Sequence, residues 1–173
     1  MWGLEALDVA LGGDLDRYGI HPRDLDGLPE IASAPFLHVG FGHLIGNTIP
    51  FVTMGAAIAL AGLARLLSVT VIVGLVSGLG VWLLGGSGSV HLGASGLVFG
   101  YATYLISRGL FSRRLVDFAV GAIVVSVWGV TLLFGLLPKA QVSWQAHVFG
   151  AIGGVIAARL AARSRKRHRE LGA

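Results

Sequence analysis

The chain has 173 residues, of which 54% are hydrophobic and only 13% are charged, and its mean hydropathy is +0.78. So little charge excludes an ordinary soluble domain and is typical of a polytopic membrane protein. The sequence has no cysteine, which excludes a disulfide framework and thiol catalysis. The formal net charge of +4 comes from clustered basic residues, so it is read as a topology signal, and no nucleic-acid partner is expected.

A membrane-spanning helix needs about 20 mainly apolar residues. The chain opens with Met1–Leu11, which is apolar but short and carries two acids. The stretch from Gly12 to Pro35 is rich in proline, glycine and acids, and predicts a loop with a short interfacial helix. In chain order, the apolar segments that follow predict helices at Val39–Ala61, Leu66–Leu84, Gly93–Ser107, Leu115–Leu137 and Gln145–Ala162.

With the first segment counted, the sequence predicts an all-α membrane protein with a six-helix transmembrane bundle. Met1–Leu11 would span only about 16 Å at 1.5 Å per residue, against a hydrocarbon core of roughly 30 Å. We therefore expect either that the true start lies upstream or that the first helix is peripheral. The predicted organisation is one transmembrane domain at residues 1–162 and a basic cytoplasmic tail at residues 163–173.

The basic residues indicate the orientation. In a six-helix topology, ten lysines and arginines fall on one side of the membrane and three on the other. The richer side is cytoplasmic by the positive-inside rule. Both termini are thus predicted to be cytoplasmic, in a multi-pass protein of the plasma (inner) membrane. The ten are Arg65, Arg108, Arg113, Arg114, Arg159, Arg163, Arg165, Lys166, Arg167 and Arg169, and the three are Arg17, Arg23 and Lys139.

Polar residues gather near the outer ends of three helices that are predicted to run in the same direction. These helices begin near Val39, Gly93 and Gln145. Because hydrocarbon penalises polar groups, intramembrane polar residues are candidates for function. The residues that would lie at a similar depth are His38, His43, Asn47, Ser95, Ser143, Gln145 and His147.

Glycines predict how two of these helices meet. They stand four residues apart in both helices, at Gly96 and Gly100 and at Gly150 and Gly154. Such small-xxx-small surfaces let two helix backbones approach closely. Ser95 directly precedes the first pair, and His147 lies three residues before the second pair on the same helix face. Packing of the two surfaces would bring Ser95 within reach of His147.

A serine beside a histidine is the pair that nucleophilic catalysis needs. A serine hydroxyl is a weak nucleophile until a base takes its proton, and histidine suits that task near neutral pH. Ser95 is the predicted nucleophile and His147 the predicted base. Candidate oxyanion donors are the Ser95 amide at a helix N-terminus and the side chains of His43 and Asn47. Asp117 lies at the cytoplasmic end and no acidic third member is apparent, so the sequence predicts a Ser-His dyad.

Three pieces of the sequence resemble the rhomboid intramembrane serine proteases: PFLHVGFGHLIGN, HLGASGLVFG and AHVFGAIGG. The resemblance extends from about residue 18 to residue 160. It implies six helices, Ser95 as nucleophile, His147 as base, and His43 and Asn47 at the oxyanion. It also implies no metal or other cofactor, and water that reaches the dyad through a cavity open to the outside. His38 matches a histidine common in the family, without an assigned role.

One departure from the family pattern bears on the site. Phe99 stands where the family often has tyrosine. A phenyl ring can still pack on the histidine but cannot donate a hydrogen bond. His91, just before the nucleophile turn, is interpreted as a loop residue rather than a catalyst.

The implied function is that of a serine-type endopeptidase that cleaves transmembrane segments near their outer ends. Its partners would be transmembrane protein substrates and the lipid bilayer, and the oligomeric state is left open. One alternative is a non-catalytic rhomboid-like protein that binds membrane helices, although such proteins typically lack the serine or the histidine. Another is a metal or haem protein that uses His38, His43 and His147, although the sequence has no HExxH motif.

Overall fold

The computed structural model describes residues 1–139 and 142–172, with residues 166–171 described by their backbone alone. Regular structure among these residues is helical apart from two isolated bridges, which confirms the predicted all-α class. The elements in chain order are α1 (Trp2–Ala10), the 3₁₀ helix η1 (Asp14–Tyr18), α2 (Glu30–Ser33), the 3₁₀ helix η2 (Ala34–Phe36), α3 (Gly40–Ala59), α4 (Leu63–Leu84), α5 (Ser95–Ser112), α6 (Leu115–Gly135) and α7 (Trp144–Leu171).

Four of the described helices are long and apolar enough to cross a bilayer, judged by length and composition. They are α3, α4, α6 and the Trp144–Arg165 part of α7. The predicted count of six crossings is not confirmed, because α1 has only nine residues and α5 is not among the four. The place of α5 in the bundle explains its lower apolarity.

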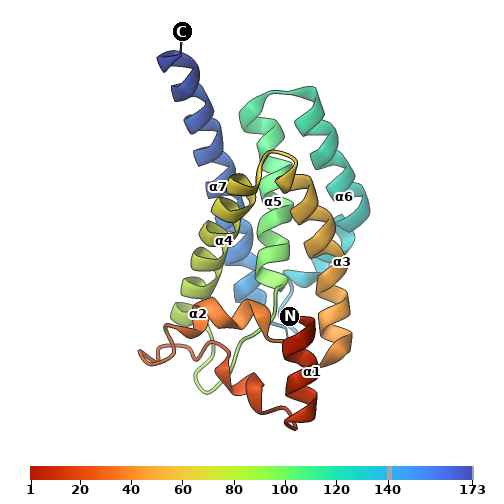
Figure 1. Ribbon diagram of the computed structural model, residues 1–173, viewed down its shortest axis with the longest axis vertical. Helices are drawn as coiled ribbons and strands as arrows, with labels where there is room; N and C mark the ends of the chain where they lie inside the picture. Colours follow the sequence, from red (N-terminus) through yellow and green to blue (C-terminus); the bar gives the residue numbers. More distant parts are fainter. Residues whose placement is uncertain (140–141, 173) are drawn as a thin grey trace.

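The central helix of the bundle is α5. Figure 1 shows it in green, enclosed by α3, α4, α6 and α7. Eleven of its 18 residues are buried, whereas only three of the 21 residues of α6 are buried. Its Tyr101 belongs to a core that also includes Met54 of α3, Val73 of α4 and Ala158 of α7. Because other helices surround α5, it needs no continuous apolar surface toward lipid, and small residues serve its close packing.

The last helix extends further than the sequence predicted. The predicted helix ended at Ala162, with a basic tail from residue 163. In the structure α7 continues without a break to Leu171, and Figure 1 shows it projecting beyond the other helices near the C-terminus. The tail residues are good helix formers, which explains the continuation. The side chains of Lys166, Arg167 and Arg169 lie outside the described part of the chain.

The N-terminal third lies along one end of the bundle. The short helix α1 lies beside the start of α3 (Figure 1), and the indole nitrogen of Trp2 donates to Oγ1 of Thr48 at 3.2 Å. The predicted loop contains η1, α2 and η2, in agreement with the expected short helix. Ile31 of α2 packs against Gly78 of α4, where a Cβ would lie 3.1 Å from Cβ of Ile31. This layer therefore covers the end of the bundle at which α3, α5 and α7 begin.

The glycine surfaces pack as predicted. A Cβ at Gly150 would meet the carbonyl oxygen of Gly96, and a Cβ at Gly154 would meet the carbonyl oxygen of Gly100. Helices α5 and α7 are therefore in backbone contact along both pairs, as small-xxx-small surfaces allow. This contact aligns the starts of the two helices that carry Ser95 and His147.

Candidate active site

The four residues predicted to act in catalysis line one cavity. Ser95 of α5, His147 of α7, and His43 and Asn47 of α3 border a space of about 420 Å³. Apolar side chains of α6, among them Trp128, complete much of the lining. Apolar walls with a few convergent polar groups are typical of a site that binds and orients a ligand.

The backbone just before Ser95 is held by three contacts. The Gly93 amide donates to the carbonyl oxygen of Ala34 at 2.9 Å, and the Ala94 amide donates to Nε2 of His38 at 3.4 Å. Gly93 has a φ of +112°, which favours glycine, and a Cβ there would lie 2.6 Å from Cε1 of His43. The chain therefore enters α5 through a fixed turn, and Ser95 starts from a defined position.

His38, for which the sequence suggested no role, is bonded to the turn that precedes Ser95. Its side chain is buried, and burial, with a smaller contribution from the nearby His43, lowers the pKa of His38 to about 4. Because Nε2 accepts the hydrogen bond from the Ala94 amide, the neutral ring carries its proton on Nδ1. His38 thus supports the turn that precedes the nucleophile.

A main-chain carbonyl orients His147. Its Nδ1 lies 2.6 Å from the carbonyl oxygen of Gly135, at the end of α6. A carbonyl oxygen only accepts hydrogen bonds, so Nδ1 carries the proton and Nε2 of the neutral ring keeps a free lone pair. A general base needs that tautomer. The Gly135 carbonyl takes the orienting part that an acid plays in a triad, in line with the absence of an acidic candidate in the sequence.

The ring of Phe99 fixes the plane of the His147 ring. The two rings stack at 4.1 Å between centroids with an interplanar angle of 3°. This is the packing expected of a phenyl ring at this position. Gly135 lies against both rings, since a Cβ there would be 2.6 Å from Cζ of Phe99 and 3.4 Å from Nδ1 of His147. Sequence reasoning missed Gly135 because it follows a long apolar run and its contribution comes from the backbone.

Donors for an oxyanion border the same cavity. Nδ2 of Asn47 is buried and has no hydrogen-bond partner among the described residues. A buried amide donor without a partner is rare and indicates a ligand or a catalytic role. The Ser95 amide is the first of α5, so no carbonyl of its own helix accepts from it. No hydrogen bond joins Ser95 to His147 in the described structure, and catalytic hydrogen bonds often tighten only when substrate binds.

Two polar side chains, Ser77 and the predicted Gln145, join α4 to the start of α7. Oγ of Ser77 in α4 donates to the carbonyl oxygen of Ala146 at 2.9 Å, and Nε2 of Gln145 donates to the carbonyl oxygen of Leu84 at 3.4 Å. Both bonds attach the start of α7 to α4. Ser77 was missed by sequence reasoning, although a polar residue inside an apolar helix is a usable signal.

The metal alternative receives no support from the arrangement of side chains. Within residues 1–139 and 142–172, no group of three or more histidine and acidic side chains is placed as ligands of one ion. His38 and His43 lie edge to face at 5.1 Å between ring centroids, and Nδ1 of His147 is bonded to the Gly135 carbonyl oxygen.

An apolar helical bundle with a serine, two histidines and an asparagine around one cavity defines a class: polytopic membrane proteins with a polar site inside the bundle. The family model described as Rhomboid domain matches residues 26–164, which is most of the chain. The chain therefore belongs to the rhomboid family, and it is an integral membrane protein.

Similar proteins occur in several bacteria. An uncharacterized protein of Mycobacterium tuberculosis is 41% identical over 97% of this chain and 73% of that protein. An uncharacterized protein of Mycobacterium leprae is also 41% identical, over 97% of this chain and 70% of that protein. The putative rhomboid protease YdcA of Bacillus subtilis is 26% identical over 76% of this chain and 66% of that protein.

Proposed function

We propose that this protein is a serine endopeptidase that cleaves transmembrane segments of other membrane proteins. The observation that carries the proposal is the shared cavity of Ser95, His147, His43 and Asn47. Membership of the rhomboid family supports it, as does the relative named a putative rhomboid protease. A non-catalytic role as a helix-binding protein has no comparable support, because both the serine and the histidine are present and border one space.

In the proposed reaction, Oγ of Ser95 attacks the carbon of the scissile peptide carbonyl while Nε2 of His147 takes the hydroxyl proton. The carbonyl π electrons move to oxygen, and the resulting oxyanion accepts hydrogen bonds from Asn47 Nδ2, the Ser95 amide and His43. When the intermediate collapses, the C–N bond breaks and the His147 imidazolium protonates the leaving amine. Water then attacks the acyl-enzyme with the same base, which restores the Ser95 hydroxyl. No metal ion is required.

The proposed substrate is a membrane-spanning segment that unwinds locally near its outer end. Backbone groups of a helix in lipid are already hydrogen-bonded to one another, so the scissile carbonyl must leave the helix before attack. A cavity of about 420 Å³ suits a short extended piece of chain rather than an intact helix. Small or helix-breaking residues at the cut should therefore favour cleavage.

The proposed setting is the plasma (inner) membrane, with the C-terminus in the cytoplasm and the cavity near the outer face. The prediction of a cytoplasmic N-terminus is not supported, because the described chain starts at the end of the bundle opposite the C-terminus (Figure 1). The bias of ten basic residues against three supports this orientation. The structure places basic residues at the end of the bundle away from the candidate site. Arg65 at the start of α4 and Ser164 near the end of α7 border a separate cavity, which Ser95 does not line.

The decisive test is labelling of the purified protein with a fluorophosphonate, which reacts with activated serines. The unsubstituted protein should be labelled, and Ser95→Ala should not. Ser68→Ala is the matched control, because Ser68 lies on α4 outside this cavity. Folded protein that resists labelling and leaves a model transmembrane substrate intact would favour the non-catalytic alternative. Labelling that survives Ser95→Ala would place the nucleophile elsewhere.

A further inference from the structure

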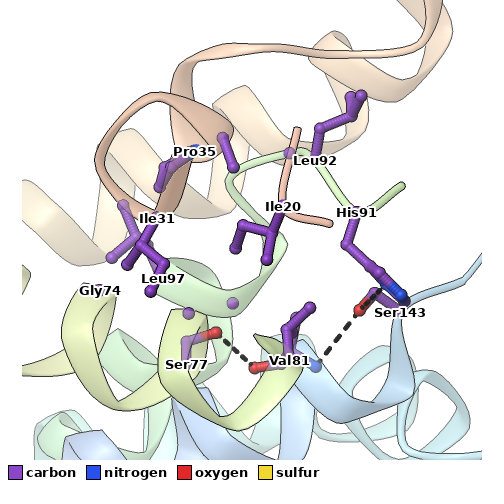
Figure 2. Close-up of a pocket in the computed structure, with 15 residues that line it drawn as sticks. Ile20, Ile31, Pro35, Gly74, Ser77, Val81, His91, Leu92, Leu97 and Ser143 are labelled. Carbon is purple, nitrogen blue, oxygen red and sulfur yellow. Dashed lines mark hydrogen bonds between the residues drawn. The ribbon is translucent and has the colours of Figure 1, made fainter. Parts of the chain in front are cut away.

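His91 links the two segments that lead into the proposed catalytic pair. It lies in the loop between α4 and α5, and Figure 2 shows its ring directed toward Ser143. Nδ1 of His91 is 2.8 Å from Oγ of Ser143, and Nε2 is 2.8 Å from Oγ of Ser89. Ser89 belongs to the same loop as His91, but Ser143 lies immediately before α7. The bond to Ser143 therefore joins two parts of the chain that are 52 residues apart.

The hydrogen-bond pattern of this network suits a neutral imidazole ring. Oγ of Ser143 accepts from the Ala146 amide at 3.4 Å, which leaves its hydroxyl proton free to be donated to Nδ1 of His91. Nε2 of His91 then carries the ring proton and donates to Ser89, whose hydroxyl donates to the Gly86 carbonyl at 2.6 Å. Each polar atom has a partner of the right kind. Burial also lowers the pKa of His91, which favours the neutral ring.

The position of the bond relates it to the site. His91 stands four residues before Ser95, and Ser143 stands four residues before His147. The His147 amide donates to the Ser143 carbonyl at 3.2 Å, so a shift of Ser143 is passed directly to the first turn of α7. The glycine pairs hold α5 and α7 together further along the helices. The turn before α5 is held by residues of the N-terminal layer, and the start of α7 is bonded to α4. The bond from His91 to Ser143 joins these two approaches directly to each other.

We infer that His91 is a positioning residue that holds Ser143 and the first turn of α7 against the nucleophile loop. Its function is to keep His147 in register with Ser95. This inference rests on the proposed function, because the register matters only if the two residues react together. A displacement of about 1 Å between reacting groups can lower a rate by about 100-fold. A small cavity of about 30 Å³ lies next to His91 and Ser143 (Figure 2). If the bond between these residues is removed, the segment around Ser143 has space into which it could move.

The test compares His91→Ala and Ser143→Ala with Ser89→Ala, which removes the partner inside the loop but leaves the bond between segments. We expect fluorophosphonate labelling and kcat to fall by about 10- to 100-fold in the first two, with KM little changed. Ser89→Ala should stay within about twofold of the unsubstituted protein, and Ser143→Thr, which keeps the hydroxyl, should recover most of the rate. The double variant His91→Ala with Ser143→Ala should be no slower than either single variant.

A second measurement does not depend on activity. In ¹⁵N NMR of the imidazoles, Ser143→Ala should shift the Nδ1 signal of His91, and Ser89→Ala should shift its Nε2 signal. Normal rates in His91→Ala, or an unchanged Nδ1 signal in Ser143→Ala, would overturn the inference. If the unsubstituted protein is not labelled at all, the proposed function fails, and the NMR result still decides whether the bond between the segments exists.

Discussion

Protonation of His38 should destabilise the fold through the turn that carries Ser95. The ring accepts a hydrogen bond from the Ala94 amide through Nε2, and it is buried with 1% of its surface exposed. A proton on Nε2 would replace that acceptor by a second donor facing an amide. The perturbation is therefore acidification, compared between the unsubstituted protein and His38→Gln, whose side-chain oxygen can still accept from Ala94 without titrating in this range.

The magnitude follows from the two pKa values. Unfolded His38 binds its proton below about pH 6.5, whereas burial lowers the pKa in the folded protein to about 4. Between these values the unfolded state binds more protons, so the stability present above pH 6.5 is lost as the pH falls toward 4. At about 1.4 kcal/mol per pKa unit, the loss is about 2 kcal/mol by pH 5 and about 3 kcal/mol below pH 4.

The assay is thermal unfolding in detergent at several pH values between 7.5 and about 4, followed by tryptophan fluorescence. Other groups titrate in the same range, so the informative quantity is the difference in pH slope between the two proteins. By pH 5 the unsubstituted protein should lose roughly 4–8 °C more in Tm than His38→Gln does. Equal slopes for the two proteins would refute the assignment of a buried, neutral, hydrogen-bonded His38.

Three further predictions concern the cavity and the helix contacts. Asn47→Ala should lower kcat by up to about 100- to 1000-fold with the nucleophile still labelled by fluorophosphonate, and an unchanged kcat would remove Asn47 from the oxyanion site. Gly150→Ala should lower the free energy of unfolding by about 1–3 kcal/mol, because the added Cβ meets the Gly96 carbonyl oxygen. Gly42→Ala is the control and should cost nothing, since no atom lies within 4 Å of the added Cβ, and equal effects of the two variants would contradict the close contact. Asp117→Asn should cost about 3–5 kcal/mol, because Asp117 is buried and pairs with the Arg108 guanidinium at 2.9 Å, and an unchanged Tm would show that the pair contributes no stability.

The features that the sequence could predict are those with a period or a spacing. Apolar length gave the helices α3 to α6 to within a few residues at most boundaries, and glycines four residues apart gave the contact between α5 and α7. The same reasoning brought Ser95 and His147 to one cavity, since helix direction and depth follow from topology. Their catalytic roles stay predictions until a labelling experiment is done.

The features that could not be predicted depend on backbone atoms and on tertiary neighbours. The Gly135 carbonyl could not be predicted as the partner of His147, because every residue has a backbone carbonyl. Only the position of the end of α6 in the fold brings this carbonyl to the histidine. The role of His38 depends on the Ala94 amide, 56 residues away. The count of six crossings is not confirmed, because length and composition mark neither the short α1 nor the central α5 as a membrane span. The end of α7 was predicted too early, because charge was taken as a sign that the helix stops.

The hydrogen bond from His147 to the Gly135 carbonyl also determines which mutations could remove the partner of this histidine. A carboxylate in this position could be lost through one codon change or neutralised by acid, but a peptide carbonyl is encoded by no particular side chain and does not titrate. Random substitution at residue 135 would thus leave the acceptor in place. Selection would instead act on size, because any added carbon would press against the Phe99 ring beside the imidazole. Glycine suits this position because of the room it leaves, while the hydrogen-bond acceptor is a backbone atom that substitution of the side chain cannot delete.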